Sequence, residues 1–212
     1  MRNYLTEFIG AFFLCLTIGM TVVNGTPMAP LAIGCSLMIM VYMGGHISGG
    51  HYNPAVSLAA VMRGALPAAQ LVPYWVSQLL GAVVAGAVTQ VIMGATAAPA
   101  PAASASTVAA LLNEVLFTFA LCLVVLNVAT SKKTSGNSYY GLAIGFTVVV
   151  GAFAGGGVSG GAYNPAVGLG LNLVHGMVAG AGMGHAWLYL VGPLLGGALA
   201  ATVFKVQEAE AS

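Results

Sequence analysis

The chain has 212 residues, of which 59% are hydrophobic and only 4% are charged, and its formal net charge is +1. An ordinary soluble domain carries about 25% charged residues, so this composition excludes a soluble globular fold and makes lipid the expected solvent. It also excludes a nucleic-acid partner, because no basic patch is available to neutralise phosphates.

The N-terminal apolar run resembles a signal peptide only at first sight. Arg2 precedes the run, but Glu7 interrupts it and no small-residue cleavage site closes it. We therefore expect a first membrane helix here. In all, six segments are long enough to span about 30 Å of hydrocarbon at about 1.5 Å per residue. They are expected at 4–23, 28–46, 67–94, 108–130, 139–157 and 185–205.

Two further apolar segments, 53–62 and 164–174, are too short to span. Each begins at Asn-Pro, and proline suits the first turn of a helix. Non-helical backbone at membrane depth is tolerated only inside protein or against a water-filled cavity. We therefore expect two half-helices, each fed by a Gly-rich loop that enters the membrane.

The chain contains an internal repeat. The sequence GHISGGHYNPAVSL at 45–58 matches GGVSGGAYNPAVGL at 156–169 in 10 of 14 positions, at an offset of 111 residues. Each half has three spans and one half-helix. Because three is odd, the second copy enters from the opposite side of the membrane, which predicts an inverted repeat.

The repeat sets the expected domain boundaries. They are a first repeat at 1–94, a linker at 95–107, a second repeat at 108–206 and a tail at 207–212. The linker is rich in Pro, Ala and Ser and is expected to be a plain connection between the halves.

Positive charge predicts the orientation. If the N-terminus is cytoplasmic, all the strong bases fall on the cytoplasmic side, as the positive-inside rule requires. These bases are Arg2, Arg63, Lys132, Lys133 and Lys205. The C-terminus is then cytoplasmic too, and the linker is extracellular. The short loops suggest a bacterial inner membrane.

The two re-entrant loops are expected to meet near the midplane, with the positive N-terminal ends of both half-helices pointing at each other. Asn53 and Asn164 are good N-cap residues, and their amides could donate into a passage. Donors and dipoles of this kind disfavour cations and protons but accommodate a neutral hydrogen-bonding molecule. The loops before them could turn carbonyls inward from Gly49, Gly50, His51, Gly160, Gly161 and Ala162.

These features resemble the aquaporin, or major intrinsic protein, family. The resemblance rests on six spans, a Glu in the first and fourth spans, and two Asn-Pro-Ala boxes. The boxes are Asn53, Pro54, Ala55 and Asn164, Pro165, Ala166. The resemblance implies an all-α membrane protein with six transmembrane helices and two re-entrant half-helices. It also implies a homotetramer and a passive channel for water and small uncharged solutes.

The resemblance implies residue roles as well. Asn53 and Asn164 would be donors at the pore centre, and Glu7 and Glu114 would brace the two loops. His46 is expected to brace the fold. His51 matches a family position that faces the cytoplasmic half of the pore.

One family position departs from the usual pattern. Most relatives carry Arg after the second box, where it narrows a selectivity filter, but here the residue is Val167. Counting back from the boxes places the other filter positions at Ile33, Ala152 and Gly161. The expected ring therefore has no aromatic residue, charge or side-chain donor, and it should be wide unless a neighbour fills it. Candidate fillers are Phe153, Met43 and Met183.

A wide apolar ring would pass glycerol, urea or ammonia beside water, whereas a dry ring would resist wetting and slow water. Two other classes remain open: a structural or junctional membrane protein with little conductance, and a secondary transporter. The transporter would need a coupling-ion site, and the chain has no Asp. No enzyme motif, cofactor or metal site is expected, since Cys15, Cys35 and Cys122 lack metal-ligand spacing.

Overall fold

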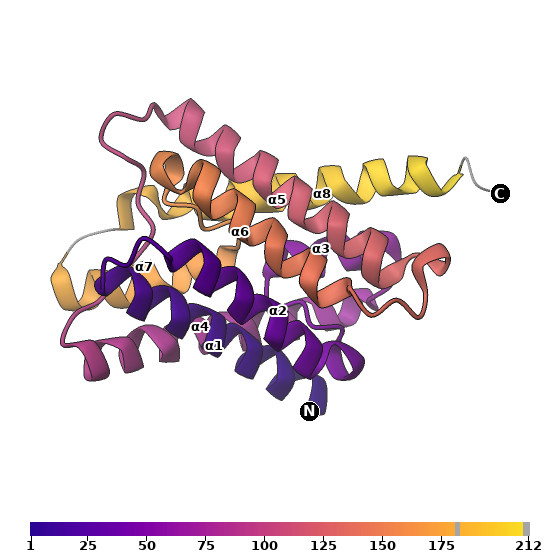
Figure 1. The fold of residues 1–212 in the computed structure, drawn as a ribbon, viewed down its shortest axis with the longest axis horizontal. Helices are drawn as coiled ribbons and strands as arrows, with labels where there is room; N and C mark the ends of the chain where they lie inside the picture. Colours follow the sequence, from indigo (N-terminus) through magenta and orange to yellow (C-terminus); the bar gives the residue numbers. More distant parts are fainter. Residues whose placement is uncertain (181–182, 210–212) are drawn as a thin grey trace.

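The computed structural model describes residues 1–180 and 183–209, and every regular element in them is helical (Figure 1). Six helices are long and apolar enough to cross a membrane. They are α1 (Arg2–Val23), α2 (Ala29–Ser48), α4 (Leu71–Met93), α5 (Thr107–Thr130), α6 (Tyr140–Ser159) and α8 (Ala186–Ala209). The remaining elements are α3 (Pro54–Arg63), α7 (Pro165–Ala179) and the 3-10 turns η1 (Ala68–Gln70), η2 (Lys132–Thr134) and η3 (Met183–His185). The predicted class, six spans and two half-helices, is confirmed.

The second half-helix is longer than the sequence suggested. The predicted segment stopped at 174, but α7 continues to Ala179. A helix of this kind ends where a residue adopts the left-handed conformation, and in α7 that residue is Gly180, with φ of 69°. In α3 the same role falls to Gly64 at φ 83°. Of the predicted tail 207–212, residues 210–212 lie outside the described part of the chain.

The two repeats build equivalent helix pairs. Helix α1 packs along α4, and α5 packs along α8 in the same way, while α2 and α6 cross each other. The α2–α6 crossing depends on Gly34 and Gly145, since a Cβ on either glycine would lie against the carbonyl oxygen of the other. These two glycines are 111 residues apart, which is the offset of the repeat. Small residues therefore permit the close helix approach that packing in lipid requires.

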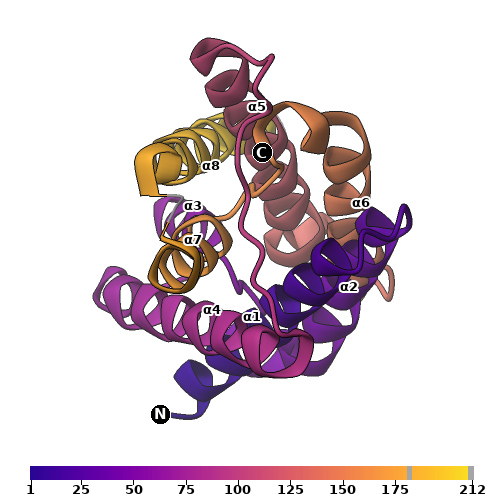
Figure 2. The same ribbon diagram turned by 90° about the vertical axis from the view of Figure 1, so that its left-hand side faces the viewer.

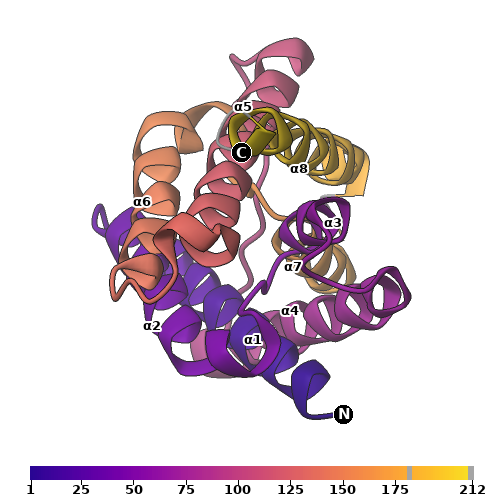
Figure 3. The same cartoon turned by 90° about the vertical axis from the view of Figure 1, so that its right-hand side faces the viewer.

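The bundle has two distinct ends. At one end, which we call the linker end, residues 95–106 run across the face of the bundle from α4 to α5 (Figure 2). At the other, the termini end, α1 begins and α8 finishes (Figure 3). The chain enters from the termini end before α3 and from the linker end before α7. The N-termini of α3 and α7 consequently meet inside the bundle.

Candidate pore

The two Asn residues of the repeated boxes cap the half-helices. Asn53 precedes Pro54 with an extended backbone, and its Oδ1 accepts a hydrogen bond from the N–H of Ala55 at 2.9 Å. Asn164 does the same for α7, accepting from Ala166 at 2.9 Å. Each cap satisfies one backbone donor of the first turn and leaves the side-chain Nδ2 free to act elsewhere.

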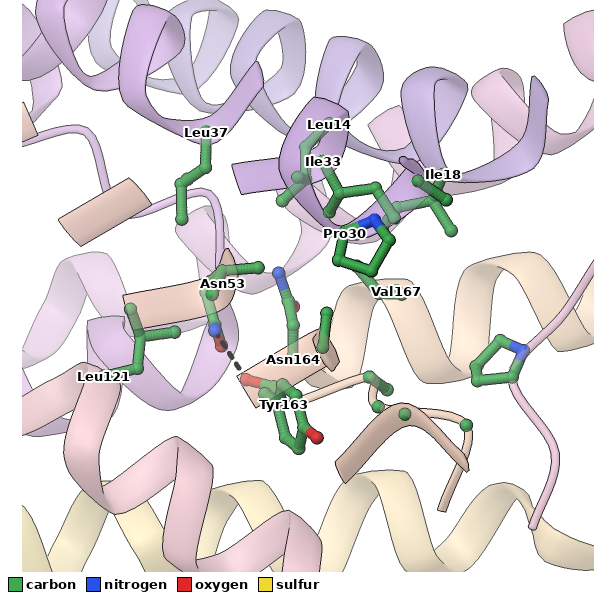
Figure 4. Close-up of a pocket in the computed structure, with 18 of the residues that line it drawn as sticks. Leu14, Ile18, Pro30, Ile33, Leu37, Asn53, Leu121, Tyr163, Asn164 and Val167 are labelled. Carbon is green, nitrogen blue, oxygen red and sulfur yellow. Dashed lines mark hydrogen bonds between the residues drawn. The ribbon is translucent and has the colours of Figure 1, made fainter. Parts of the chain in front are cut away.

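The free amides tie the two loops together. Asn53 Nδ2 donates to the carbonyl of Tyr163 at 2.9 Å (Figure 4). Asn164 Nδ2 donates to the carbonyl of Tyr52 at 2.9 Å. An amide nitrogen has two hydrogens, so each Asn retains one N–H beyond this cross-link. Each amide therefore braces the opposite loop with one N–H and has a second N–H for the predicted donation into the passage.

Both tyrosines adopt a backbone conformation that bulky residues rarely occupy. Their φ angles are 52° at Tyr52 and 49° at Tyr163, in the left-handed region. Each hydroxyl is held by a carbonyl of the preceding long helix: Tyr52 donates to Met40 at 2.9 Å and Tyr163 to Gly151 at 2.8 Å. The surrounding packing thus fixes a turn that aims each carbonyl at the opposite Asn.

A buried carboxylate organises the first loop. Glu7 is fully buried and accepts hydrogen bonds from the backbone N–H groups of His51, at 3.0 Å, and Tyr52, at 2.6 Å. It also accepts from Ser48 Oγ at 2.6 Å and Gln78 Nε2 at 2.7 Å. A buried carboxylate is tolerated when its oxygens are saturated in this way, and here the bonds fix the loop backbone.

Glu114 has the equivalent position in the second repeat. It is also fully buried and accepts from Ser159 Oγ at 2.6 Å and from the N–H groups of Ala162 and Tyr163 at 3.0 and 2.7 Å. Among the described residues no fourth donor to Glu114 is seen, and the position equivalent to Gln78 is Pro193.

His46 takes no part in either network. It lies exposed on the last turn of α2 and makes no hydrogen bond within the described residues. The expected bracing role is therefore not seen for His46. Ser48, two residues further along, makes the contact with Glu7 instead. The sequence did contain a signal for this bracing contact with the buried Glu. Both repeats carry a serine at the entrance of the loop, Ser48 and Ser159.

His51 connects the loop to the passage. Its Nδ1 lies 3.1 Å from Ser57 Oγ, and that hydroxyl accepts from Gln78 Nε2 at 2.9 Å. The imidazole also contacts the ring of Tyr74, with 5.3 Å between centroids. His51 has no counterpart in the second repeat, where Ala162 stands. The two loops therefore share a backbone design but differ in side-chain polarity.

A cavity of about 380 Å³ runs from the linker end past the Asn pair to His51. Its walls are mainly aliphatic, and the lining residues among those the structure describes include no Asp, Glu, Lys or Arg. Figure 4 shows Asn53 and Asn164 side by side, with Leu14, Ile18, Ile33 and Leu37 facing them from α1 and α2. The polar side chains that line the cavity are thus concentrated at the meeting point of the half-helices.

The structure brings the four expected filter positions to this cavity: Ile33, Ala152, Gly161 and Val167. Val56, the counterpart of Val167 in the first box, lines it too. Of the six expected carbonyl positions, five line the cavity, at Gly50, His51, Gly160, Gly161 and Ala162, whereas Gly49 is not among the lining residues.

The expected fillers of the ring lie elsewhere. Phe153, Met43 and Met183 are 57%, 37% and 50% exposed and are not among the cavity-lining residues. Residues 97–100 of the linker, in contrast, do line the cavity. The linker therefore contributes to the cavity wall as well as connecting the halves. The composition of the linker does not predict that it lies at the cavity, because that placement depends on contacts with residues distant in the sequence.

An inverted repeat of membrane helices, with two half-helices meeting at a cavity, is an arrangement of membrane channels and of secondary transporters. The profile of the family described as "Major intrinsic protein" matches residues 1–204. The chain therefore belongs to the major intrinsic protein family. It is an integral membrane protein that forms a passive channel for water and small solutes and is not an enzyme.

Several relatives are similar over most of the chain. Aquaporin NIP1-1 of Zea mays is 33% identical over 97% of this chain and 74% of its own length. Glycerol uptake facilitator protein-like 6 of Lactiplantibacillus plantarum is 33% identical over 99% of this chain and 100% of its own length. The X-ray structure of the aquaglyceroporin from Plasmodium falciparum has the same fold, with a TM-score of 0.86 at 22% identity over 96% of this chain and 94% of that chain.

Proposed function

We propose that this channel is weakly selective and passes glycerol, urea or ammonia as well as water. The observation that carries the proposal is that Ile33, Ala152, Gly161 and Val167, the four expected filter positions, all line the cavity, and none of their side chains offers a charge, a donor or an acceptor. An Arg at the last position would add five N–H donors and a fixed positive charge. Without it, no side chain at these positions can hydrogen-bond a solute, and size becomes the main basis of selection there.

Exclusion of cations and protons is assigned to the Asn pair. Asn53 and Asn164 each keep one N–H beyond the cross-loop bond, and both half-helices point a positive end toward the passage. The first turns carry no acidic residue that would cancel these dipoles. A neutral molecule finds donors there, whereas a cation meets two positive ends of about half a charge each.

We further propose that the termini are cytoplasmic and that the two repeats span 1–94 and 108–206. The bases Arg2, Arg63, Lys132, Lys133 and Lys205 all belong to the termini end of the bundle. One of them, Arg63, pairs with Glu208 at 3.5 Å. This distribution supports cytoplasmic termini. We also propose that the protein resides in a bacterial inner membrane and assembles as a homotetramer. The homotetramer rests on the usual assembly of the family.

The test is a stopped-flow measurement on proteoliposomes that contain the purified protein. Vesicle volume is followed in gradients of sucrose, glycerol and urea, and internal pH in a gradient of ammonia. We expect water flow together with permeation of at least one of the three small solutes. Water flow with all three excluded would refute the proposed weak selectivity.

A matched variant, Val167→Arg, tests the position of the ring. Because Val167 is only 2% exposed and lines the cavity, an Arg there should lower solute flux more than water flux. Unchanged permeation of every solute in correctly folded Val167→Arg would show that the ring lies elsewhere.

A further inference from the structure

An asparagine next to the buried Glu114 joins the second loop to the helix before it. Asn113 lies on α5 and is partly buried. Its Nδ2 donates to the Ser159 hydroxyl at 2.7 Å, and it also lies 3.1 Å from the Gly155 carbonyl and 3.2 Å from the Tyr163 hydroxyl. An amide nitrogen has two hydrogens, so the three acceptors share them. One side chain of α5 therefore holds both the end of α6 and the loop that follows.

The first repeat has a different contact at this position. The counterpart of Asn113 is Thr6, 107 residues earlier. The Thr6 hydroxyl donates to the Arg2 carbonyl of its own helix at 3.1 Å. Both side chains pack on a glycine of the next helix, since a Cβ on Gly44 would be 2.5 Å from Thr6 Cγ2 and a Cβ on Gly155 would be 2.7 Å from Asn113 Nδ2. The packing is thus shared by the repeats, but the donation toward the loop belongs to the second.

Asn113 supplies a brace where the second repeat has no counterpart of Gln78. In the first repeat, Gln78 Nε2 donates to Glu7 at 2.7 Å and to Ser57 at 2.9 Å. Pro193 stands at the equivalent position of α8, and proline offers neither an N–H nor a side-chain donor. A side-chain amide therefore braces the first loop from α4 and the second from α5.

The Ser159 hydroxyl links Asn113 to the cavity wall. It accepts from Asn113 Nδ2 at 2.7 Å and from the Gly161 N–H at 3.1 Å, and it donates to Glu114 Oε1 at 2.6 Å. A hydroxyl has one donor and two acceptor positions, so all three are filled. Gly161 is one of the four expected filter positions that line the cavity. The hydroxyl that holds Gly161 is therefore itself held by Asn113.

From these contacts we propose that Asn113 is a positioning residue of the pore, which holds Gly161 in place through Ser159 and so sharpens the size limit at the filter positions. The inference rests on the proposed function, because it concerns selection among the same solutes. Gly161 has no side chain to anchor it by packing, and its φ of 64° lies in the left-handed region. Its position depends on hydrogen bonds of its backbone. Without the Asn113 donors, the loop should move more and admit larger solutes relative to water.

The test compares two asparagines of the same helix. Asn113→Leu keeps a side chain of similar size without donors, and Asn113→Thr introduces the residue that the first repeat carries. The matched control is Asn127→Leu, about 21 Å further along α5. The Asn127 amide donates to the Leu123 carbonyl at 2.9 Å and to Gln207 at 3.4 Å. Glycerol and water flux in proteoliposomes, each corrected for empty liposomes, and hydrogen–deuterium exchange of the peptide that contains Gly161 are measured for every variant.

The ratio of glycerol flux to water flux is the decisive readout, because a variant that only folds less well loses both fluxes in proportion. For the Asn113 variants we expect this ratio to rise by about threefold or more and the Gly161 peptide to exchange about threefold faster. Asn127→Leu should keep both values within about 1.5-fold of wild type. If Asn113→Leu does not fold, Asn113→Thr decides the question. An unchanged or lower flux ratio, even with faster exchange, would overturn the inference alone.

The proposed function can fail separately. Wild-type vesicles that pass water but exclude glycerol, urea and ammonia would refute the proposed weak selectivity. Glycerol entry through Asn113→Thr would then still support the positioning role, and exclusion of glycerol by that variant would overturn it. Water flux no greater than that of empty liposomes would refute both together.

Discussion

Replacing Glu114 with Leu should remove the brace of the second loop. Three donors lose their acceptor: the hydroxyl of Ser159 and the backbone N–H groups of Ala162 and Tyr163. Each buried donor left without a partner costs about 1–3 kcal/mol, so the variant should be destabilised by about 3–9 kcal/mol. At about 2–4 °C per kcal/mol for a chain of this size, the unfolding midpoint should fall by at least about 6 °C.

The loss should also reach the passage. Tyr163 supplies the carbonyl that accepts from Asn53, and the next residue is Asn164. A released Tyr163 N–H therefore loosens both halves of the cross-loop contact. Thermal unfolding in detergent and water flux in proteoliposomes should fall together, whereas Glu114→Gln, which keeps one acceptor oxygen, should lie between Leu and wild type.

Glu208 provides the matched control for this prediction. Its ion pair with Arg63 is partly exposed, and such pairs contribute about 0–1 kcal/mol. Glu208→Gln should therefore leave both the unfolding midpoint and the flux nearly unchanged. If Glu114→Leu behaved like Glu208→Gln in both assays, the hydrogen bonds to Glu114 would not be what holds the loop.

Three further outcomes are expected. Glu7→Leu should be at least as destabilising as Glu114→Leu, because Gln78 Nε2 also loses one of its two acceptors and keeps only Ser57 Oγ; a smaller shift in thermal unfolding would contradict the comparison. Asn53→Asp should lose the donor to the Tyr163 carbonyl and place two oxygens against each other, so water flux should drop, and wild-type flux would argue against the cross-link. Gly34→Ala should impair folding, since its Cβ would lie 2.5 Å from the Gly145 carbonyl oxygen, while Gly157→Ala, with no atom within 4 Å, should be neutral in the same thermal assay.

The hydropathy and the repeat were sufficient to predict the fold class. Lipid imposes a simple rule, since backbone polar groups must be satisfied within each span, and long apolar segments can do so only as helices. Repetition of Asn-Pro-Ala at 53 and 164 then indicated the half-helices, because Asn and Pro have local roles at a helix start. The predicted end of α7 at 174 was wrong because no local signal ends the helix there. The helix continues until Gly180 adopts the left-handed conformation.

The tertiary structure alone decided the details of the site. That the amides of Asn53 and Asn164 bind the opposite loop follows from contacts over 110 residues or more of sequence. Likewise, Ser48 and not His46 binds Glu7, because the two side chains leave the last turn of α2 in different directions.

The position of linker residues 96–102 is the clearest case. Residues 96–102 are Thr, Ala and Pro alone, as in a neutral connection, and they give no reason for the linker to lie at the mouth of a pore. The linker is held there by hydrogen bonds to the second repeat. Its partners are the side chains of Asn172 and His175 and the carbonyl of Val158. Local sequence determines elements whose hydrogen bonds are local. Where the partners come from distant segments, only the packed structure determines which groups meet.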